Sequence, residues 1–280
     1  MSNIKFLDGG YIYELNKLHN DSGEYAIINN PDIVKKLHQK YIDAGCDYIT
    51  TANYGFKSLK FDNWKELTLK SCQLLDSIRN GKFKIMGCLP PYYESYQEGE
   101  INDSFESFYI ELIKIMEPYV DSYILETCIC PLQLIKTLNY IFKSTKKDLY
   151  ISVYPGGKIE KKHLQFLCNM EYSQIKGILI NCCSFDEMKE YYTNNIKSLS
   201  FNYYSFGFYC NKINEKEFNK LSDQEKRKNW TQKFTNNEMI SKDELTLFLS
   251  NFSKNKNIII GGCCGYDSND LTILKNYLIN

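Results

Sequence analysis

Short apolar runs alternate with amphipathic helical patterns along almost the whole of this 280-residue chain. The runs have the length and composition of buried β-strands, and the patterns between them repeat at the helical period. Eight runs predict strands at 4–7, 48–51, 84–87, 122–126, 149–154, 177–181, 258–261 and within 199–209. Helices are predicted at 32–44, 64–78, 105–119, 131–142, 161–170, 185–192 and 270–278.

Eight strands that alternate with helices over roughly 250 residues match a closed parallel (β/α)8 TIM barrel. An open doubly wound sheet is the main alternative, but the sequence has neither of the glycine-rich phosphate-binding motifs that accompany it. No repeat, linker or internal boundary interrupts the pattern, so residues 1–280 are expected to form one domain. The polar stretch 211–237 reads as a solvated loop and helix rather than a binding tail.

The composition excludes several classes of function. Lys and Arg together number 34, as do Asp and Glu, so no basic surface for nucleic acid or anionic membranes is expected. No apolar run approaches the ~18–20 residues that span a bilayer. The first residues do not resemble a secretory signal. The eleven cysteines are therefore expected to be reduced thiols of a cytoplasmic protein.

Polar and sulfur-containing residues follow most of the predicted strands. In a parallel barrel these positions surround one shared mouth, because the carboxyl ends of all strands lie on the same side. The residues expected there are Asp8, Thr51, Asn53, Cys88, Glu126, Thr127, Asn181, Cys182, Tyr209, Asn211, Cys263 and Cys264. Thiols and two carboxylates dominate this set, and histidine is absent from it.

Two pairs of adjacent cysteines lie at strand ends, Cys182-Cys183 and Cys263-Cys264. Thiolates select zinc, copper(I) or iron–sulfur clusters. Three protein ligands would leave an open catalytic position on zinc, whereas four would close a structural site. Side chains alternate along a strand, so Cys182 is expected to enter the mouth and Cys183 to face away. The glycines before Cys263 allow the chain to turn both of the following thiols inward.

A zinc ion with three thiolates is a good host for a fourth sulfur, which it binds as a thiolate at neutral pH. The matching chemistry is attack by a substrate thiol on an electrophilic carbon. Asp8 and Glu126 are placed to hold an ammonium group of that substrate. The alternative for these two carboxylates is a structural role as caps or ion pairs at the barrel mouth.

The order of motifs resembles the homocysteine S-methyltransferase family over nearly the whole chain. The matching elements are Leu7-Asp8-Gly9-Gly10, Asn30-Pro31 with the helix to Gly45, Thr51-Ala52-Asn53-Tyr54, Leu125-Glu126-Thr127, Ile180-Asn181-Cys182 and Gly261-Gly262-Cys263-Cys264. The last two are the specific ones. The resemblance implies zinc bound by Cys182, Cys263 and Cys264, and methyl transfer to L-homocysteine to form methionine. It also implies that Asp8, Thr51, Asn53 and Glu126 contact the homocysteine.

The chain departs from the family pattern on the side expected to bind the methyl donor. The segments are Gly87-Cys88-Leu89-Pro90-Pro91-Tyr92 and Tyr209-Cys210-Asn211, so Tyr92, Tyr209 and Asn211 are the candidate donor-side residues. The length of the chain resembles that of family members that use S-methylmethionine or S-adenosylmethionine. The alternatives are a non-catalytic four-thiolate zinc or thiol-binding barrel that includes Cys183, and a degenerate paralogue. The sequence leaves the oligomeric state open.

Overall fold

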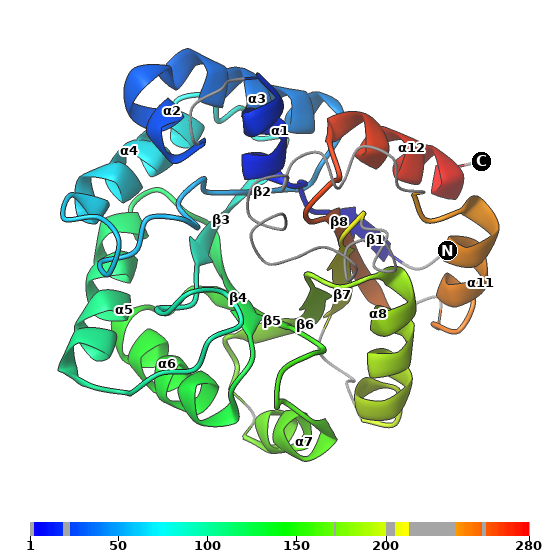
Figure 1. Ribbon diagram of the computed structural model, residues 1–280. Helices are drawn as coiled ribbons and strands as arrows, with labels where there is room; N and C mark the ends of the chain where they lie inside the picture. Colours follow the sequence, from blue (N-terminus) through cyan, green and yellow to red (C-terminus); the bar gives the residue numbers. More distant parts are fainter. Residues whose placement is uncertain are drawn as a thin grey trace, which may run out of the picture.

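A computed structural model describes residues 3–18, 23–170, 172–199, 205–212, 239–253 and 256–279. Its strands are β1 (Asn3–Phe6), β2 (Tyr48–Thr50), β3 (Lys84–Leu89), β4 (Ser122–Cys128), β5 (Asp148–Val153), β6 (Ile175–Asn181), β7 (Ser205–Cys210) and β8 (Asn257–Gly262). All pair in parallel in the order β1-β8-β7-β6-β5-β4-β3-β2. Figure 1 shows the strands inside a ring of helices. The predicted (β/α)8 barrel is confirmed.

The barrel closes between β1 and β2 through a short seam. Leu7 forms a parallel bridge with Tyr48. The Asp8 amide donates to the Tyr48 carbonyl at 3.1 Å, and the Asp47 amide donates to the Phe6 carbonyl at 2.7 Å. This seam places Asp8, the residue after the bridge, at the carboxyl end of the barrel beside β2.

Helices cover the outside of the sheet. They are α1 (Tyr11–Leu18), α2 (Gly23–Asn29), α3 (Pro31–Asp43), α4 (Trp64–Asp76), α5 (Asp103–Met116), α6 (Pro131–Ser144), α7 (Lys161–Asn169), α8 (Phe185–Tyr191), α11 (Lys242–Leu249) and α12 (Ser268–Ile279), with a π-helical turn η1 (Tyr192–Ile196). Local signals explain several starts: Pro131 occupies the first turn of α6, and Ser184 caps α8 by accepting from the Glu187 amide. None of the described helices has the length and apolar character needed to cross a membrane.

Apolar side chains form two layers that fix the barrel. A small interior cluster fills the barrel itself, with Leu7, Met86, Ile124, Tyr150, Leu179, Tyr209 and Ile259. The larger cluster lies between the strands and the helices. Full burial of an aliphatic or aromatic side chain contributes about 1.5–3 kcal/mol to the stability of the folded protein. The filled interior therefore stabilises the strands whose ends carry the site.

The structure differs from the sequence prediction at a few elements. Helices α1, α2 and α11 were not predicted, and β3 and β4 run two residues further than expected. The strand predicted within 199–209 is β7, which begins at Ser205 and ends at Cys210. The polar stretch 211–237 lies outside the described residues except for its first two positions.

Candidate functional site

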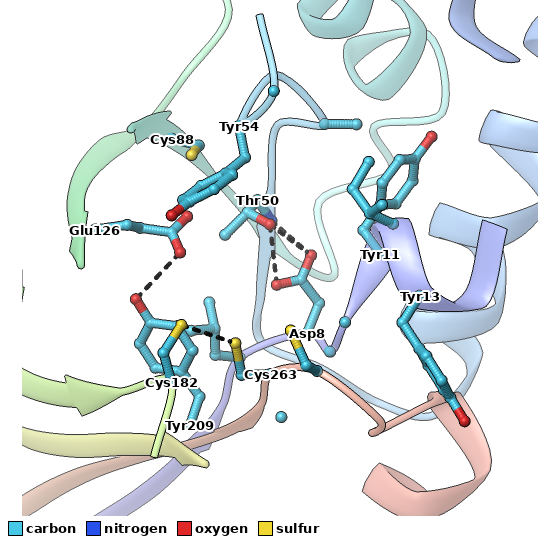
Figure 2. A pocket seen from close by; sticks show the side chains of 18 of the residues that line it. Asp8, Tyr11, Tyr13, Thr50, Tyr54, Cys88, Glu126, Cys182, Tyr209 and Cys263 are labelled. Atoms are coloured by element: carbon cyan, nitrogen blue, oxygen red, sulfur yellow. Dashed lines mark hydrogen bonds between the residues drawn. The ribbon is translucent and has the colours of Figure 1, made fainter. Parts of the chain in front are cut away.

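A cavity of about 320 Å³ opens at the carboxyl ends of the strands. Eight of the residues expected at the mouth line it: Asp8, Thr51, Cys88, Glu126, Cys182, Tyr209, Cys263 and Cys264. Figure 2 shows the two carboxylates and the thiols around this space. The tertiary structure therefore brings together residues that lie as far apart in sequence as Asp8 and Cys264.

The thiols of Cys182 and Cys263 are in contact, with 3.2 Å between the two Sγ atoms. Cys182 follows the last residue of β6 and has a φ of 57°. This left-handed conformation is uncommon for a residue other than glycine. Cys264 lines the same cavity, and its amide donates to Asn211 Oδ1 at 3.2 Å. Asn211 itself lies outside the cavity wall and holds the turn that carries Cys264.

A buried hydrogen-bond network holds Cys182 in this position. Asn181 Nδ2 donates to Thr127 Oγ1 at 2.9 Å and to Cys182 Sγ at 3.1 Å. On its other side, Asn181 Oδ1 accepts from Ser152 at 2.9 Å. Asn181 and Ser152 are fully buried, and such a satisfied polar network fixes side-chain orientation. The Asn-Cys element therefore supplies a thiol and the amide that orients it.

A β-bulge in β4 arranges the residues next to this network. The register of β4 with β5 shifts between Leu125 and Cys128, and Thr127 has a φ of 54°. In a regular strand, two adjacent side chains face opposite sides, whereas a bulge re-aims side chains locally. Glu126 therefore lines the cavity while its neighbour Thr127 still bonds Asn181.

Asp8 is a buried carboxylate held by β2. Its Oδ2 accepts from the Thr50 amide at 2.8 Å and from the Thr50 hydroxyl at 2.9 Å. Burial raises the pKa of Asp8 to about 7, although the bonds from Thr50 oppose this rise. Thr50 also lines the cavity, and the sequence analysis did not identify it. Two bonds leave this carboxylate with lone pairs for a further donor.

Glu126 is the second carboxylate of the cavity. It accepts from the Tyr209 hydroxyl at 3.2 Å, and Figure 2 shows this bond across the site from Asp8. Burial raises the pKa of Glu126, while hydrogen bonds from Cys88 and Tyr209 act in the opposite direction. A group that supplies positive charge and N–H donors would favour the ionised forms of both carboxylates.

Thr51, in the cavity wall, and Asn53, behind it, are joined by hydrogen bonds to each other and to β3. The Thr51 hydroxyl donates to Asn53 Oδ1 at 2.6 Å and accepts from the Cys88 amide at 2.9 Å. Asn53 Nδ2 donates to the Cys88 carbonyl at 3.0 Å. Both residues are buried, and Asn53 lies outside the residues that line the cavity. The substrate contacts predicted for them stay predictions, and the visible role is to tie β2 to β3.

The donor-side candidates occupy different places. Tyr209 lines the cavity, but Tyr92 packs against Phe105 and Phe108 outside it. The structure adds Tyr54, which the sequence analysis named only as part of a family motif, and Tyr11, Tyr13, Ser95 and Tyr96, which it did not name. The sequence analysis considered residues that directly follow a strand, so it missed Ser95 and Tyr96, which lie within a long loop after β3.

Soft-metal chemistry fits the thiols of this cavity. Zinc–sulfur bonds of about 2.3 Å in tetrahedral geometry separate two sulfurs by about 3.8 Å, so the Cys182–Cys263 pair at 3.2 Å would open slightly around an ion. Within the described ranges, no three His, Cys, Asp or Glu side chains already form a metal-binding group. The bond to Cys263 and burial hold the pKa of Cys182 well above its ordinary value. A cation at this position would stabilise the thiolates.

Cys183 has a different environment from its neighbour Cys182. It is 2% exposed, belongs to the outer apolar cluster, and is absent from the residues that line the cavity. Its hydrogen bond with Cys210, together with burial, raises the pKa of the Cys183 thiol. A metal site closed by four thiolates would need the Cys183 side chain to leave the outer apolar cluster and enter the cavity.

Comparison with known proteins gives one family. A family model described as homocysteine S-methyltransferase matches residues 5–278. No curated protein sequence gives a significant match.

Solved structures with the same fold include the homocysteine methyltransferase MmuM from Escherichia coli. Its apo form has a TM-score of 0.70 at 18% identity and covers 99% of this chain and 96% of its own. Its metallated form has a TM-score of 0.72 at 17% identity, with 98% and 96% covered. The 2-keto 3-deoxygluconate aldolase from Picrophilus torridus has a TM-score of 0.55 at 13% identity, with 90% and 74% covered. At these identities the likeness supports the barrel fold alone.

Proposed function

The chain belongs to the homocysteine S-methyltransferase family, and we propose that it transfers a methyl group from an onium donor to the thiol of L-homocysteine. The family resemblance predicted from the sequence is confirmed, and the chain is an enzyme of the methyltransferase class. S-methylmethionine or S-adenosylmethionine is the proposed donor, methionine the proposed product, and both substrates are small molecules.

The contact between Cys182 and Cys263 in the wall of an acidic cavity carries this proposal. These two thiols and Cys264 would hold a zinc ion, which when bound supplies positive charge that keeps the acceptor sulfur in its thiolate form. The metallated form of the Escherichia coli relative is consistent with a metal in this fold. Zinc is our proposal for its identity.

The carboxylates would bind the other end of the acceptor. Asp8 and Glu126 lie on opposite sides of the cavity, and the ammonium group of an amino acid can donate three hydrogen bonds. Asp8 must be ionised to accept them fully, so binding of the acceptor is expected to weaken as the pH falls below the Asp8 pKa of about 7.

The chain's contribution to the transfer step is positioning. The acceptor sulfur forms its new bond to the methyl carbon with its own lone pair, and the donor's sulfur or nitrogen leaves with the electrons of the broken bond as a neutral group. The acceptor's thiol proton has already left to solvent. Such an in-line displacement needs alignment rather than a general acid or base.

A paired substitution tests the thiol assignment. Cys182→Ala is expected to lose zinc and methionine formation, because it removes a proposed ligand. Cys183→Ala is the matched control: it changes the adjacent residue, whose side chain packs in the outer core, and should keep both. Zinc content and methionine produced from S-methylmethionine and from S-adenosylmethionine are measured in parallel. Full zinc content and turnover in Cys182→Ala would refute the assignment.

A further inference from the structure

One lining residue of the cavity, Tyr96, has an unusual backbone conformation. It lies in the loop between β3 and α5, lines the cavity, and has a φ of 68°. A positive φ is a real outlier for a bulky side chain. Such strain persists where the surrounding structure holds it, and it concentrates at binding sites.

The loop that carries Tyr96 is anchored to α6 and to the segment that follows β5. Gln133 in α6 donates to the Gly99 carbonyl at 2.9 Å. Lys158, in the segment between β5 and α7, pairs with Glu98 at 2.8 Å. These contacts follow Tyr96 by two and three residues. They hold the loop over the mouth of the barrel and keep the tyrosine in its strained conformation.

Tyr96 is also the most exposed of the tyrosines that line the cavity. One face of Tyr11 stacks on His38 with the ring centroids 5.1 Å apart. The Lys57 ammonium lies 5.5 Å from the centroid of Tyr54. The other two lining tyrosines are Tyr13 at 3% exposed and Tyr209 at 4%. Tyr96 is 46% exposed.

A second aromatic ring supports Tyr96 from outside the cavity. The centroid of Tyr154 lies 4.5 Å from that of Tyr96, with the two planes tilted by 48°. Gly156 makes room for this support, because a Cβ atom there would lie 2.5 Å from the Tyr154 ring. One side of Tyr96 is therefore backed by a ring, and the other remains available to a ligand.

The charge of the cavity favours a cation beside this ring. Among the described residues that line it, none is Lys, Arg or His, whereas Asp8, Glu126 and the proposed metal-binding thiols do line it. Tyr96 lines the cavity together with Cys182, Cys263 and Cys264, and the pKa of its hydroxyl is raised by burial and, after that, by negative charge on these thiols. The ring thus adjoins the position where the acceptor sulfur would meet a methyl donor.

We propose that Tyr96 is a specificity-determining residue that receives the positively charged onium group of the methyl donor on its ring face. This inference rests on the proposed function, because it concerns the donor of that reaction. A cation within about 6 Å of an aromatic centroid is attracted by the negative face of the ring. The inference goes beyond the residues predicted from the sequence, which placed the donor beside Tyr92, Tyr209 and Asn211.

The charge change during transfer predicts a kinetic signature. The donor is a cation before the step, and its positive charge is lost as the methyl group moves to the thiolate. Attraction to the ring is therefore stronger for the bound donor than for the transition state. An interaction of that kind contributes to donor affinity rather than to the chemical step.

The test compares Tyr96→Leu, which removes the ring, with Tyr96→Phe, which keeps it. We expect Tyr96→Leu to raise the donor KM by about 2- to 30-fold without lowering kcat, and to leave the KM for homocysteine unchanged. Tyr96→Phe is expected to restore the donor KM to within about 2-fold, because the ring face remains. Binding of tetramethylammonium and of neutral tert-butanol is measured by calorimetry, and Tyr96→Leu should weaken only the former.

The outcomes separate this inference from the proposed function. An unchanged donor KM in Tyr96→Leu, or an equal loss of both probes, would overturn the role of Tyr96 while methionine formation by the unmodified enzyme still supports the reaction. Absence of turnover with every onium donor would contradict the proposed function. Weaker tetramethylammonium binding in Tyr96→Leu would still support an onium site at Tyr96.

Discussion

Replacing Asp8 by asparagine is expected to stabilise the free protein at neutral pH while weakening its binding of the acceptor. The pKa of Asp8 rises from 3.8 to about 7 because the side chain is buried. Each pKa unit corresponds to about 1.4 kcal/mol, so the ionised carboxylate lowers the free energy of unfolding by up to about 4 kcal/mol above pH 7. Asparagine carries no charge and avoids this cost.

The pH dependence follows from which state binds the proton more tightly. The folded protein holds the Asp8 proton to higher pH than the unfolded chain, so the contribution of Asp8 to stability is greatest below pH 3.8 and is lost as the pH rises to about 7. Asp8→Asn lacks this loss. Its stability relative to the unmodified protein should therefore increase with pH over this window and level off above it.

Urea unfolding of the metal-free protein without acceptor, between about pH 5 and pH 8, measures this difference. Thr50→Val provides a second variant, because it removes the hydroxyl that donates to Asp8 at 2.9 Å. Loss of a donor to the carboxylate should move the Asp8 transition to higher pH. A stability difference for Asp8→Asn that is the same at every pH would refute the reasoning.

The same substitution has an opposite effect on binding. Hydrogen bonds to a charged group contribute about 1.5–3 kcal/mol, so Asp8→Asn should raise the homocysteine KM by about 10- to 150-fold at pH 8. The donor KM should not change. An unaltered homocysteine KM would show that Asp8 has a structural role at the barrel mouth, the alternative considered from the sequence.

Two further substitutions probe buried polar groups. Asn181→Ala should lower the free energy of unfolding by about 1–3 kcal/mol, because the hydroxyls of Ser152 and Thr127 each lose one buried hydrogen bond. It should also weaken zinc binding about 10- to 100-fold, because Cys182 loses its orienting amide. Competition with a chromogenic chelator measures the zinc affinity, and an unchanged affinity would contradict this role. His38 is fully buried, has no hydrogen-bond partner at either ring nitrogen among the described residues, and has a pKa lowered by burial to about 3. Its protonation on unfolding favours the unfolded chain increasingly as the pH falls below 6.5. His38→Phe should therefore gain stability over the unmodified protein most strongly near pH 5 in urea unfolding, and a gain that does not depend on pH would contradict this assignment.

The sequence by itself determined the barrel fold and most of the residues that lie at its mouth. Strand periodicity and turn residues are local signals, and eight of them in alternation with helices leave few architectures. Since all strands of a parallel barrel end on one side, the same reading grouped Asp8, Glu126, Cys182 and Cys263 at one mouth. The sequence analysis also placed Cys182 in the mouth and Cys183 outside it, as observed. The cause is different from the one assumed: Leu179 faces the interior, so regular alternation would turn Cys182 outward, and the left-handed φ of Cys182 brings its thiol to the cavity instead.

Only the tertiary structure decided which groups meet within that mouth. The partner of Asp8 is Thr50, which the sequence analysis did not identify. The short β1–β2 seam brings these two residues together although they lie 42 positions apart in the sequence. The bulge at Glu126 breaks the alternation on which sequence reasoning depends.

The loop that presents Tyr96 shows the same limit most clearly. Its position depends on contacts with α6 and with the segment after β5, and its positive φ follows no local pattern of glycine or asparagine. Long-range contacts of this kind select one loop conformation among many that the local sequence permits. The thiols were therefore foreseeable from the sequence, whereas the tyrosine that lines the same cavity was not.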